Sequence, residues 1–208
     1  MRIVRRSLVL SAVLLAACGG GLTPLPPAQA PAPFPVDSTP PVVTTGDGRP
    51  APDDGEALRA RELMVPVDGV APARVPDTFT ASRGERGIHG ALDILAPRGT
   101  RVLAADAGTV WKVRSNPLGG KTVYTIDEAQ RFVYYYAHLD RYVDGLKEGQ
   151  RVAKGDVLGY VGTTGNAPPN TPHLHFQVLR YKGNGRWWDG TPINPRPYLS
   201  RSGQANRR

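Results

Sequence analysis

The region between residues 63 and 181 consists of short apolar runs rich in Val, Ile, Tyr and Thr, most of them separated by Gly, Pro, Asn or Asp. Runs of this length and composition are typical of β-strands, and no long stretch with a helical period competes with them. The runs occupy residues 63–67, 91–95, 102–104, 108–114, 121–127, 131–139, 157–162 and 173–181. We therefore predict a mainly β domain over residues 58–200, with a short helical turn near residues 56–61 and few or no long helices.

Two eight-residue segments inside this region resemble each other. Residues 99–106 (GTRVLAAD) and 149–156 (GQRVAKGD) share Gly, Arg, Val and Asp at an offset of 50 residues. A sheet built from a duplicated strand-turn-strand motif would contain such a pair, although matches among common turn residues also arise by chance.

The amino terminus has the pattern of an exported protein. Arginines precede an apolar run, Leu8–Ala17, that is too short to span a bilayer, so residues 1–17 are expected to form a signal peptide. The run ends in Leu-Ala-Ala-Cys, which resembles the bacterial lipobox and implies cleavage before Cys18 and lipid attachment to it. The alternatives are a conventional signal peptide cut nearby and a twin-arginine signal, to which the residues after Arg5 and Arg6 are a loose match.

The segment after the signal is dominated by proline. Residues 19–57 contain ten of the 21 prolines and few large apolar side chains, so they cannot bury enough surface to offset the entropy of ordering. Residues 18–57 are therefore expected to be a disordered tether carrying the lipidated cysteine. Residues 201–208 are expected to be a basic C-terminal tail.

Charge limits the range of partners. The formal net charge is +8, and it falls to +5 when the three arginines of the signal are removed. A moderately basic chain suits an anionic membrane surface or cell-wall polymer. Scattered basic residues, the absence of a nucleic-acid motif and the export signal argue against nucleic acid.

The four histidines of the chain fall into a suggestive pattern. His89 and Asp93 form a His-x-x-x-Asp pair, His138 ends an aromatic run, and His173 and His175 form His-Leu-His. Alternate residues of a strand face one side, so His173 and His175 can reach one site. His89 and Asp93 would lie roughly 13 Å apart in an extended strand, so the chain must turn between them if both bind one ion. Gly87 and Gly90 favour a turn over a helix.

This combination of imidazole and carboxylate ligands favours zinc, although spacing alone does not exclude other divalent ions. A cupin-type site also uses His-x-His, but its further ligands follow that pair, whereas here the candidates precede it and only Asp189 follows. The sequence contains no Gly-x-Ser-x-Gly elbow, catalytic cysteine or phosphate-binding loop, which argues against nucleophilic and nucleotide chemistry.

The segments GIHGALDILAPRGTRVLAADAGTV, YAHL, KGDVLGYVGTTGN and PHLHFQV together resemble the LytM and lysostaphin-type zinc endopeptidases. The resemblance covers residues 63–199 and implies the antiparallel sheet called the duplicated hybrid motif. It implies that His89, Asp93 and His175 bind one Zn²⁺ per chain, with a fourth position left for water. It also implies that His138 and His173 act on that water and on the developing oxyanion; which of them is the general base stays open, and His173 is preferred.

The resemblance implies a zinc endopeptidase that cleaves peptide bonds of peptidoglycan, in a stem peptide or a cross-bridge. With the lipobox it implies a cell-envelope protein held by a lipid anchor, in the outer membrane and facing the periplasm. The alternative is a non-catalytic module of the same type that binds and activates a cell-wall amidase. The proline-rich loop at 166–172 departs from many relatives and puts the shape of the groove in question. Trp187 and Trp188 could line that groove or seal the edge of the core.

Overall fold

The computed structural model describes residues 53–84 and 87–200. The expected signal peptide, most of the tether with Cys18, and the C-terminal tail lie outside these residues. Within the described ranges, no helix is both long enough and apolar enough to cross a membrane.

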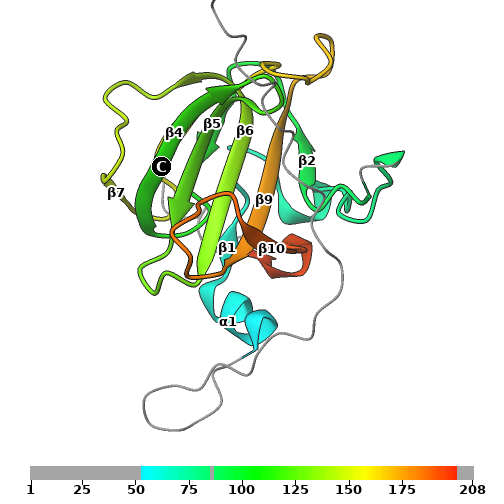
Figure 1. Cartoon of the computed structure of the whole chain (residues 1–208). Coiled ribbons are helices and arrows are strands. Elements are labelled where there is room, and N and C mark those ends of the chain that lie inside the picture. The colour runs from blue at the N-terminus through cyan, green and yellow to red at the C-terminus, as the bar shows by residue number, and fades with distance from the viewer. Residues whose placement is uncertain (1–52, 85–86, 201–208) are drawn as a thin grey trace, which may run out of the picture. The chain divides into compact units, whose positions relative to one another are not determined.

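One antiparallel sheet dominates the fold (Figure 1). Its nine strands in the described residues are β2 (Leu92–Leu95), β3 (Arg101–Leu103), β4 (Gly108–Asn116), β5 (Gly120–Ile126), β6 (Phe132–Tyr142), β7 (Arg151–Val152), β8 (Val157–Val161), β9 (His173–Tyr181) and β10 (Gly190–Ile193). The main path runs β10-β9-β6-β5-β4-β7, while β2 pairs with β9, and β8 pairs with both β6 and β3. The expectation of a mainly β, antiparallel fold is confirmed.

Most of the expected strands are present, but the first is shorter than predicted. Only Leu63–Met64 forms a strand, β1, and it pairs in parallel with β11 (Leu199–Ser200). The next residues still run beside β3, because the amide of Leu103 donates to the carbonyl of Pro66. Proline has no amide to return, so the pairing is irregular there. The unexpected strands β7, β10 and β11 are two to four residues long, too short to leave a pattern in the sequence.

The expected helical turn is a helix, α1 (Asp54–Arg61), that begins two residues earlier than predicted. Asp53 caps it by accepting a hydrogen bond from the amide of Glu56, and Glu62 ends it in the left-handed region at φ 47°. Its buried residue is Leu58. Single 3₁₀ turns follow at η1 (Pro72–Arg74) and η3 (Arg196–Tyr198).

The weak sequence repeat corresponds to a repeated structural unit. Residues 99–106 lead through β3 toward β4, and residues 149–156 lead through β7 toward β8. The two units exchange partners, since β3 pairs with β8 and β7 pairs with β4. Gly99 and Gly149 open the units with φ values of 87° and 81°, which only glycine adopts without strain. The duplicated strand-turn-strand motif is therefore present in the fold.

The two faces of the central strands carry different side chains. From Phe132 to Tyr136 on β6 and from His173 to Leu179 on β9, the even-numbered residues, such as Tyr134, Tyr136 and Phe176, are fully buried in the main core. The odd-numbered residues face the opposite side, because side chains alternate along a strand. His173 and His175 are among these, and we call their side of the sheet the histidine face.

Candidate metal centre

Strand pairing places Asp93 against His175. The two residues are direct partners in the antiparallel pair of β2 and β9, and His173 is paired in the same way with Leu95. Directly opposed residues of an antiparallel pair have β-carbons about 5 Å apart. The sheet itself therefore brings a carboxylate and an imidazole together from positions 82 residues apart.

His89 reaches the same place through the turn that its glycines predict. Gly87 and Gly90 have φ values of 80° and 66°, and β2 begins two residues after Gly90. The amide of His89 donates to the carbonyl of Ala81, which fixes the start of the turn. The expected turn between His89 and Asp93 is thus present.

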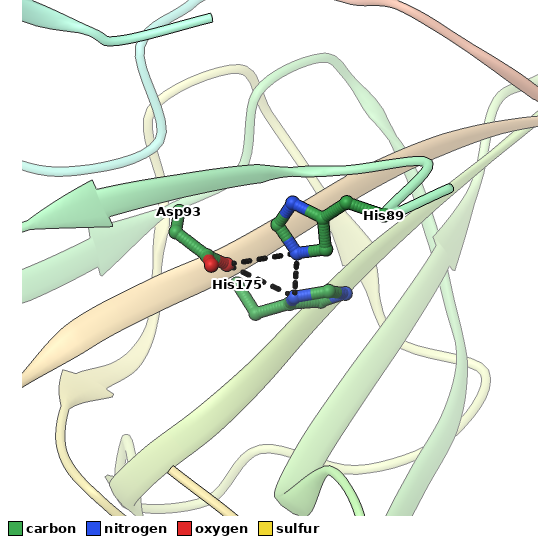
Figure 2. Close-up of side chains that lie close together, drawn as sticks. All are labelled: His89, Asp93 and His175. Carbon is green, nitrogen blue, oxygen red and sulfur yellow. Dashed lines mark hydrogen bonds and ion pairs between the residues drawn. The ribbon is translucent and has the colours of Figure 1, made fainter. Parts of the chain in front are cut away.

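The donor atoms of the three expected ligands form a nearly equilateral triangle (Figure 2). His89 Nε2 lies 3.1 Å from His175 Nδ1 and 3.2 Å from Asp93 Oδ1, and His175 Nδ1 lies 3.1 Å from Asp93 Oδ1. Ligand atoms of a tetrahedral zinc ion are about 3.3 Å apart, as follows from metal–ligand distances near 2.0 Å. The spacing of the three atoms fits one such ion.

Hydrogen bonding gives this triangle a surplus of lone pairs. His89 Nδ1 lies 3.0 Å from the carbonyl oxygen of Thr78, which can only accept, so His89 carries its proton there and presents a bare Nε2. When the His175 imidazole is neutral, the three facing atoms share at most one proton. That proton would be on Nδ1 of His175. A divalent cation would satisfy all three lone pairs at once, and the donor set therefore fits zinc chemically as well as geometrically.

Thr78 supports two of the three residues, and sequence reasoning missed it. Its hydroxyl accepts a 2.9 Å hydrogen bond from the amide of Asp93 and donates to the carbonyl of Ala91, while its own carbonyl orients His89. Thr78 lies 15 residues before Asp93 in an irregular segment, so neither spacing nor periodicity could have identified it.

The charges around Asp93 favour its ionised form. Burial opposes ionisation, but the contacts with the imidazoles of His175 and His89 outweigh it and hold the pKa of the Asp93 carboxyl well below its usual value. Arg83 contacts the second carboxylate oxygen at 3.2 Å, which leaves Oδ1 to face the imidazoles. Burial lowers the pKa of His175, so this imidazole is neutral near pH 7, as a metal ligand must be.

His138 stands at an irregularity in β6. Before it, β6 pairs with β9; after it, β6 pairs with β8, and His138 itself adopts φ 62°, which is unusual for a residue with a side chain. Its Nδ1 lies 2.8 Å from the carbonyl oxygen of Thr164, so Nε2 is left as the free acceptor. Burial lowers the pKa of His138 to about 4.

His173 is held in the same way. Its Nδ1 lies 2.8 Å from the carbonyl oxygen of Thr171, and its Nε2 lies 3.8 Å from Asp93 Oδ1. The ring centroids of His138 and His173 are 5.0 Å apart. All four histidines therefore gather at one place, two with nitrogens in the donor triangle and two beside it with a free Nε2. The proline-rich loop contributes here, because Thr171 belongs to it.

Aromatic rings extend from this centre along the histidine face. Tyr135 contacts His175 edge to face at 5.9 Å between centroids, Tyr124 stacks on Tyr135 at 4.4 Å, and Trp187 packs against Tyr124 at 4.6 Å. Trp187 is half-buried in this cluster, whereas Trp188 stays 47% exposed. The two tryptophans thus differ: the first packs on the sheet, and the second remains accessible.

Comparison with known proteins points in one direction. The model of peptidase family M23 matches residues 87–195. The chain is 38% identical over 122 residues to the L-Ala--D-Glu endopeptidase of Bacillus subtilis (strain 168). The aligned region covers 56% of this chain and 36% of that protein. The chain is also 35% identical over 124 residues to the uncharacterized lipoprotein YgeR of Escherichia coli (strain K12). That aligned region covers 60% of this chain and 43% of that protein.

Among solved structures, the orthorhombic crystal form of Helicobacter pylori Csd3 aligns with a TM-score of 0.51 and 30% identity. The alignment covers 66% of this chain and 34% of that chain. The chain therefore spans less than half the length of each of these three proteins.

Proposed function

The chain belongs to peptidase family M23, and from that premise we propose that it is a zinc-dependent endopeptidase that hydrolyses peptide bonds in peptidoglycan. The observation that carries the proposal is the triangle of His89 Nε2, Asp93 Oδ1 and His175 Nδ1, with edges of 3.1 to 3.2 Å. The relative in Bacillus subtilis is an L-Ala--D-Glu endopeptidase by name, which supports the substrate class.

The three residues of the triangle would hold one zinc ion per chain. When bound, zinc polarises a carbonyl as a Lewis acid and makes water more acidic. Asp93 contributes the negative charge, and its contact with Arg83 through Oδ2 directs Oδ1 toward the two imidazoles. His89 and His175 contribute neutral nitrogens.

His173 and His138 would handle protons and charge. Each has Nδ1 fixed by a backbone carbonyl, so each offers Nε2 to a reacting group. We assign the general base to His173, whose Nε2 lies 3.8 Å from Asp93 Oδ1 and hence beside the triangle. His138 would act on the oxyanion that develops at the scissile carbonyl once its Nε2 has taken up a proton, because the neutral ring presents only an acceptor there.

The proposal includes a place in the cell. Residues 1–17 would be a signal peptide, Cys18 the lipidated residue and 201–208 a basic tail. The tether expected over 18–57 would end before α1, which includes residues 54–57, and from it the domain would reach the cell wall. The lipoprotein name of the YgeR relative supports an envelope location. We place the anchor in the outer membrane, facing the periplasm.

Digestion of purified peptidoglycan by the mature chain tests the activity. We expect new peptide fragments, identified by mass, that disappear with a chelator and with His175→Ala. The alternative, a non-catalytic module that activates an amidase, predicts no fragments from the protein alone and amide cleavage only when an amidase is added. Identical products from the wild type and His175→Ala would contradict the endopeptidase.

A further inference from the structure

His138 lies in a β-bulge of β6. Lys121 on β5 is opposed to Leu139, whereas Val123 is opposed to Tyr136, so a step of two residues on β5 matches a step of three on β6. A bulge of this kind leaves one residue unpaired and re-aims a side chain, and bulges are common next to active sites. His138 adopts its left-handed backbone, at φ 62°, inside this step. The direction of its side chain therefore depends on how the bulge is held.

The side chain of Thr164 closes this bulge. Its hydroxyl accepts a 2.9 Å hydrogen bond from the amide of Lys121 and donates a 2.7 Å hydrogen bond to the carbonyl of Leu139. A hydroxyl can do both at once, because it carries one donor proton and two acceptor lone pairs. Lys121 and Leu139 are directly opposed residues of β5 and β6. One hydroxyl thus connects the two strands at the residue that follows His138.

The backbone of Thr164 holds the imidazole ring of His138. Its carbonyl oxygen lies 2.8 Å from Nδ1 of His138 and can only accept, so the ring carries its proton on Nδ1. The ring centroid of His138 lies 5.0 Å from that of His173 and 5.6 Å from that of His175. Thr164 therefore contacts both the strand that carries His138 and the ring that faces the other histidines.

Glycines allow the loop that bears Thr164 to approach β5 and β6 closely. A β-carbon on Gly120 would clash with the Thr164 hydroxyl, and one on Gly165 would clash with the amide nitrogen of Gly120. A β-carbon on Gly162 would lie 2.8 Å from the carbonyl oxygen of His138. Glycine is the residue that permits such close approach of one backbone to another. Backbone packing on both sides of Thr164 therefore sets where its hydroxyl and carbonyl lie.

We propose that Thr164 is the positioning residue for His138: its hydroxyl holds the bulge, and its carbonyl selects the ring form that leaves Nε2 for the reaction. The inference rests on the proposed function, in which His138 acts on the oxyanion, and it adds a residue that acts through His138. Valine has the shape of threonine but lacks the hydroxyl, so it cannot connect Lys121 to Leu139. Serine keeps the hydroxyl and should keep the connection.

The kinetic test compares Thr164→Val and Thr164→Ser with the wild type, each as the zinc-loaded mature chain acting on soluble peptidoglycan fragments. Thr164→Val should lower kcat by about 10-fold to 100-fold with KM and zinc content unchanged, because misplacing a reacting group by about 1 Å costs that much. Thr164→Ser should stay close to the wild type. Thr163, the half-buried neighbour, makes no side-chain hydrogen bond within the described part of the chain, so Thr163→Val is the matched control.

Nitrogen-15 spectra of the histidine rings measure the positioning of His138 without reference to activity. The chain has four histidines, and His138→Gln identifies the signals of this ring by their loss. Couplings between ring protons and ring nitrogens distinguish a proton on Nδ1 from one on Nε2. At pH 8 we expect the Nδ1-protonated form of His138 in the wild type, Thr164→Ser and Thr163→Val, and a mixture of both neutral forms in Thr164→Val.

The two measurements separate failure of the positioning role from failure of the proposed function. An unchanged ring form of His138 in Thr164→Val, whether or not kcat falls, would overturn the positioning role and leave the endopeptidase intact. A changed ring form without hydrolysis by any of the chains would support the positioning role and overturn the endopeptidase. If Thr164→Val does not fold, a wild-type ring protonated on Nε2, or loss of turnover in Thr164→Ser, would overturn the positioning role.

Discussion

Asp93 and His175 are direct partners across the antiparallel pair of β2 and β9, and their Oδ1 and Nδ1 atoms lie 3.1 Å apart. Strand register, rather than a flexible loop, fixes this part of the donor triangle. Sites built on strands hold their geometry more precisely than sites built on loops. Only His89 depends on a turn, and Thr78 stabilises that turn.

Thr78→Val should weaken zinc binding without unfolding the domain. Valine keeps the shape of threonine but removes the hydroxyl that accepts from the Asp93 amide. Loss of such a supporting hydrogen bond typically costs about 10-fold to 100-fold in metal affinity. Competition with a chromogenic chelator measures the affinity. Thr191→Val, at an exposed position on β10, is the matched control, and equal affinities of the two variants would refute the role of Thr78.

His173→Ala and His175→Ala should differ in metal content. His175 supplies an atom of the donor triangle, so His175→Ala should lose zinc, whereas His173→Ala should keep close to one ion per chain. Both should lose activity, His173→Ala by about 100-fold or more. Elemental analysis of the dialysed proteins measures the zinc content of each variant. Zinc lost from His173→Ala and retained by His175→Ala would show that ligand and base are exchanged.

A feature of this site could be predicted from the sequence only where it depends on residues that are near one another in the chain. The spacing of His173 and His175 implies a shared strand face, and the glycines around His89 imply a turn, so both could be predicted. The support from Thr78 could not, because it depends on how an irregular segment folds back. The left-handed backbone of His138 also leaves no trace, since the change of partner from β9 to β8 that requires it is a tertiary event.

The strands and helices of the fold also differ in whether the sequence predicts them. Long strands such as β6 and β9 carry enough apolar residues to be recognised, and the helical turn at α1 could be predicted near its observed position. The two-residue strand β7 exists because the longer β4 offers free backbone groups, and β11 pairs with β1, which is equally short, so neither leaves a pattern in the sequence. The signal peptide, tether and tail expected before residue 53 and after residue 200 lie outside the described residues and stay predictions.

Arg61→Met should destabilise the domain strongly. Arg61 joins α1 to the sheet by contacting the buried carboxylates of Asp106 at 2.8 Å and Asp127 at 2.5 Å. Removing one partner of a buried ion pair leaves charges uncompensated and costs about 3 kcal/mol. Urea unfolding measures the loss. Arg59→Met, on an exposed position of the same helix, should cost less than about 1 kcal/mol, and a similar small value for Arg61→Met would contradict the role of this contact.

Stability should fall above pH 10. Burial raises the pKa values of Tyr134 and Tyr136, so the folded protein keeps both phenols protonated while the unfolded chain releases their protons. A group with a raised folded pKa stabilises the fold below its unfolded pKa and loses that contribution as pH rises. The free energy of unfolding should drop by up to about 1.4 kcal/mol per pH unit for each tyrosine. Urea unfolding at pH 9 and pH 11 checks this, and Tyr134→Phe should reduce the slope; a flat profile would be incompatible with it.

Zinc reconstitution of the metal-free mature chain tests the central claim most directly. Hydrolysis of purified peptidoglycan would be followed by release of peptide fragments while zinc is added in known ratio to protein. We predict no release without metal, a linear rise with added zinc, and a plateau at one ion per chain. Full activity of the metal-free chain, or no activity at any zinc ratio, would contradict the account.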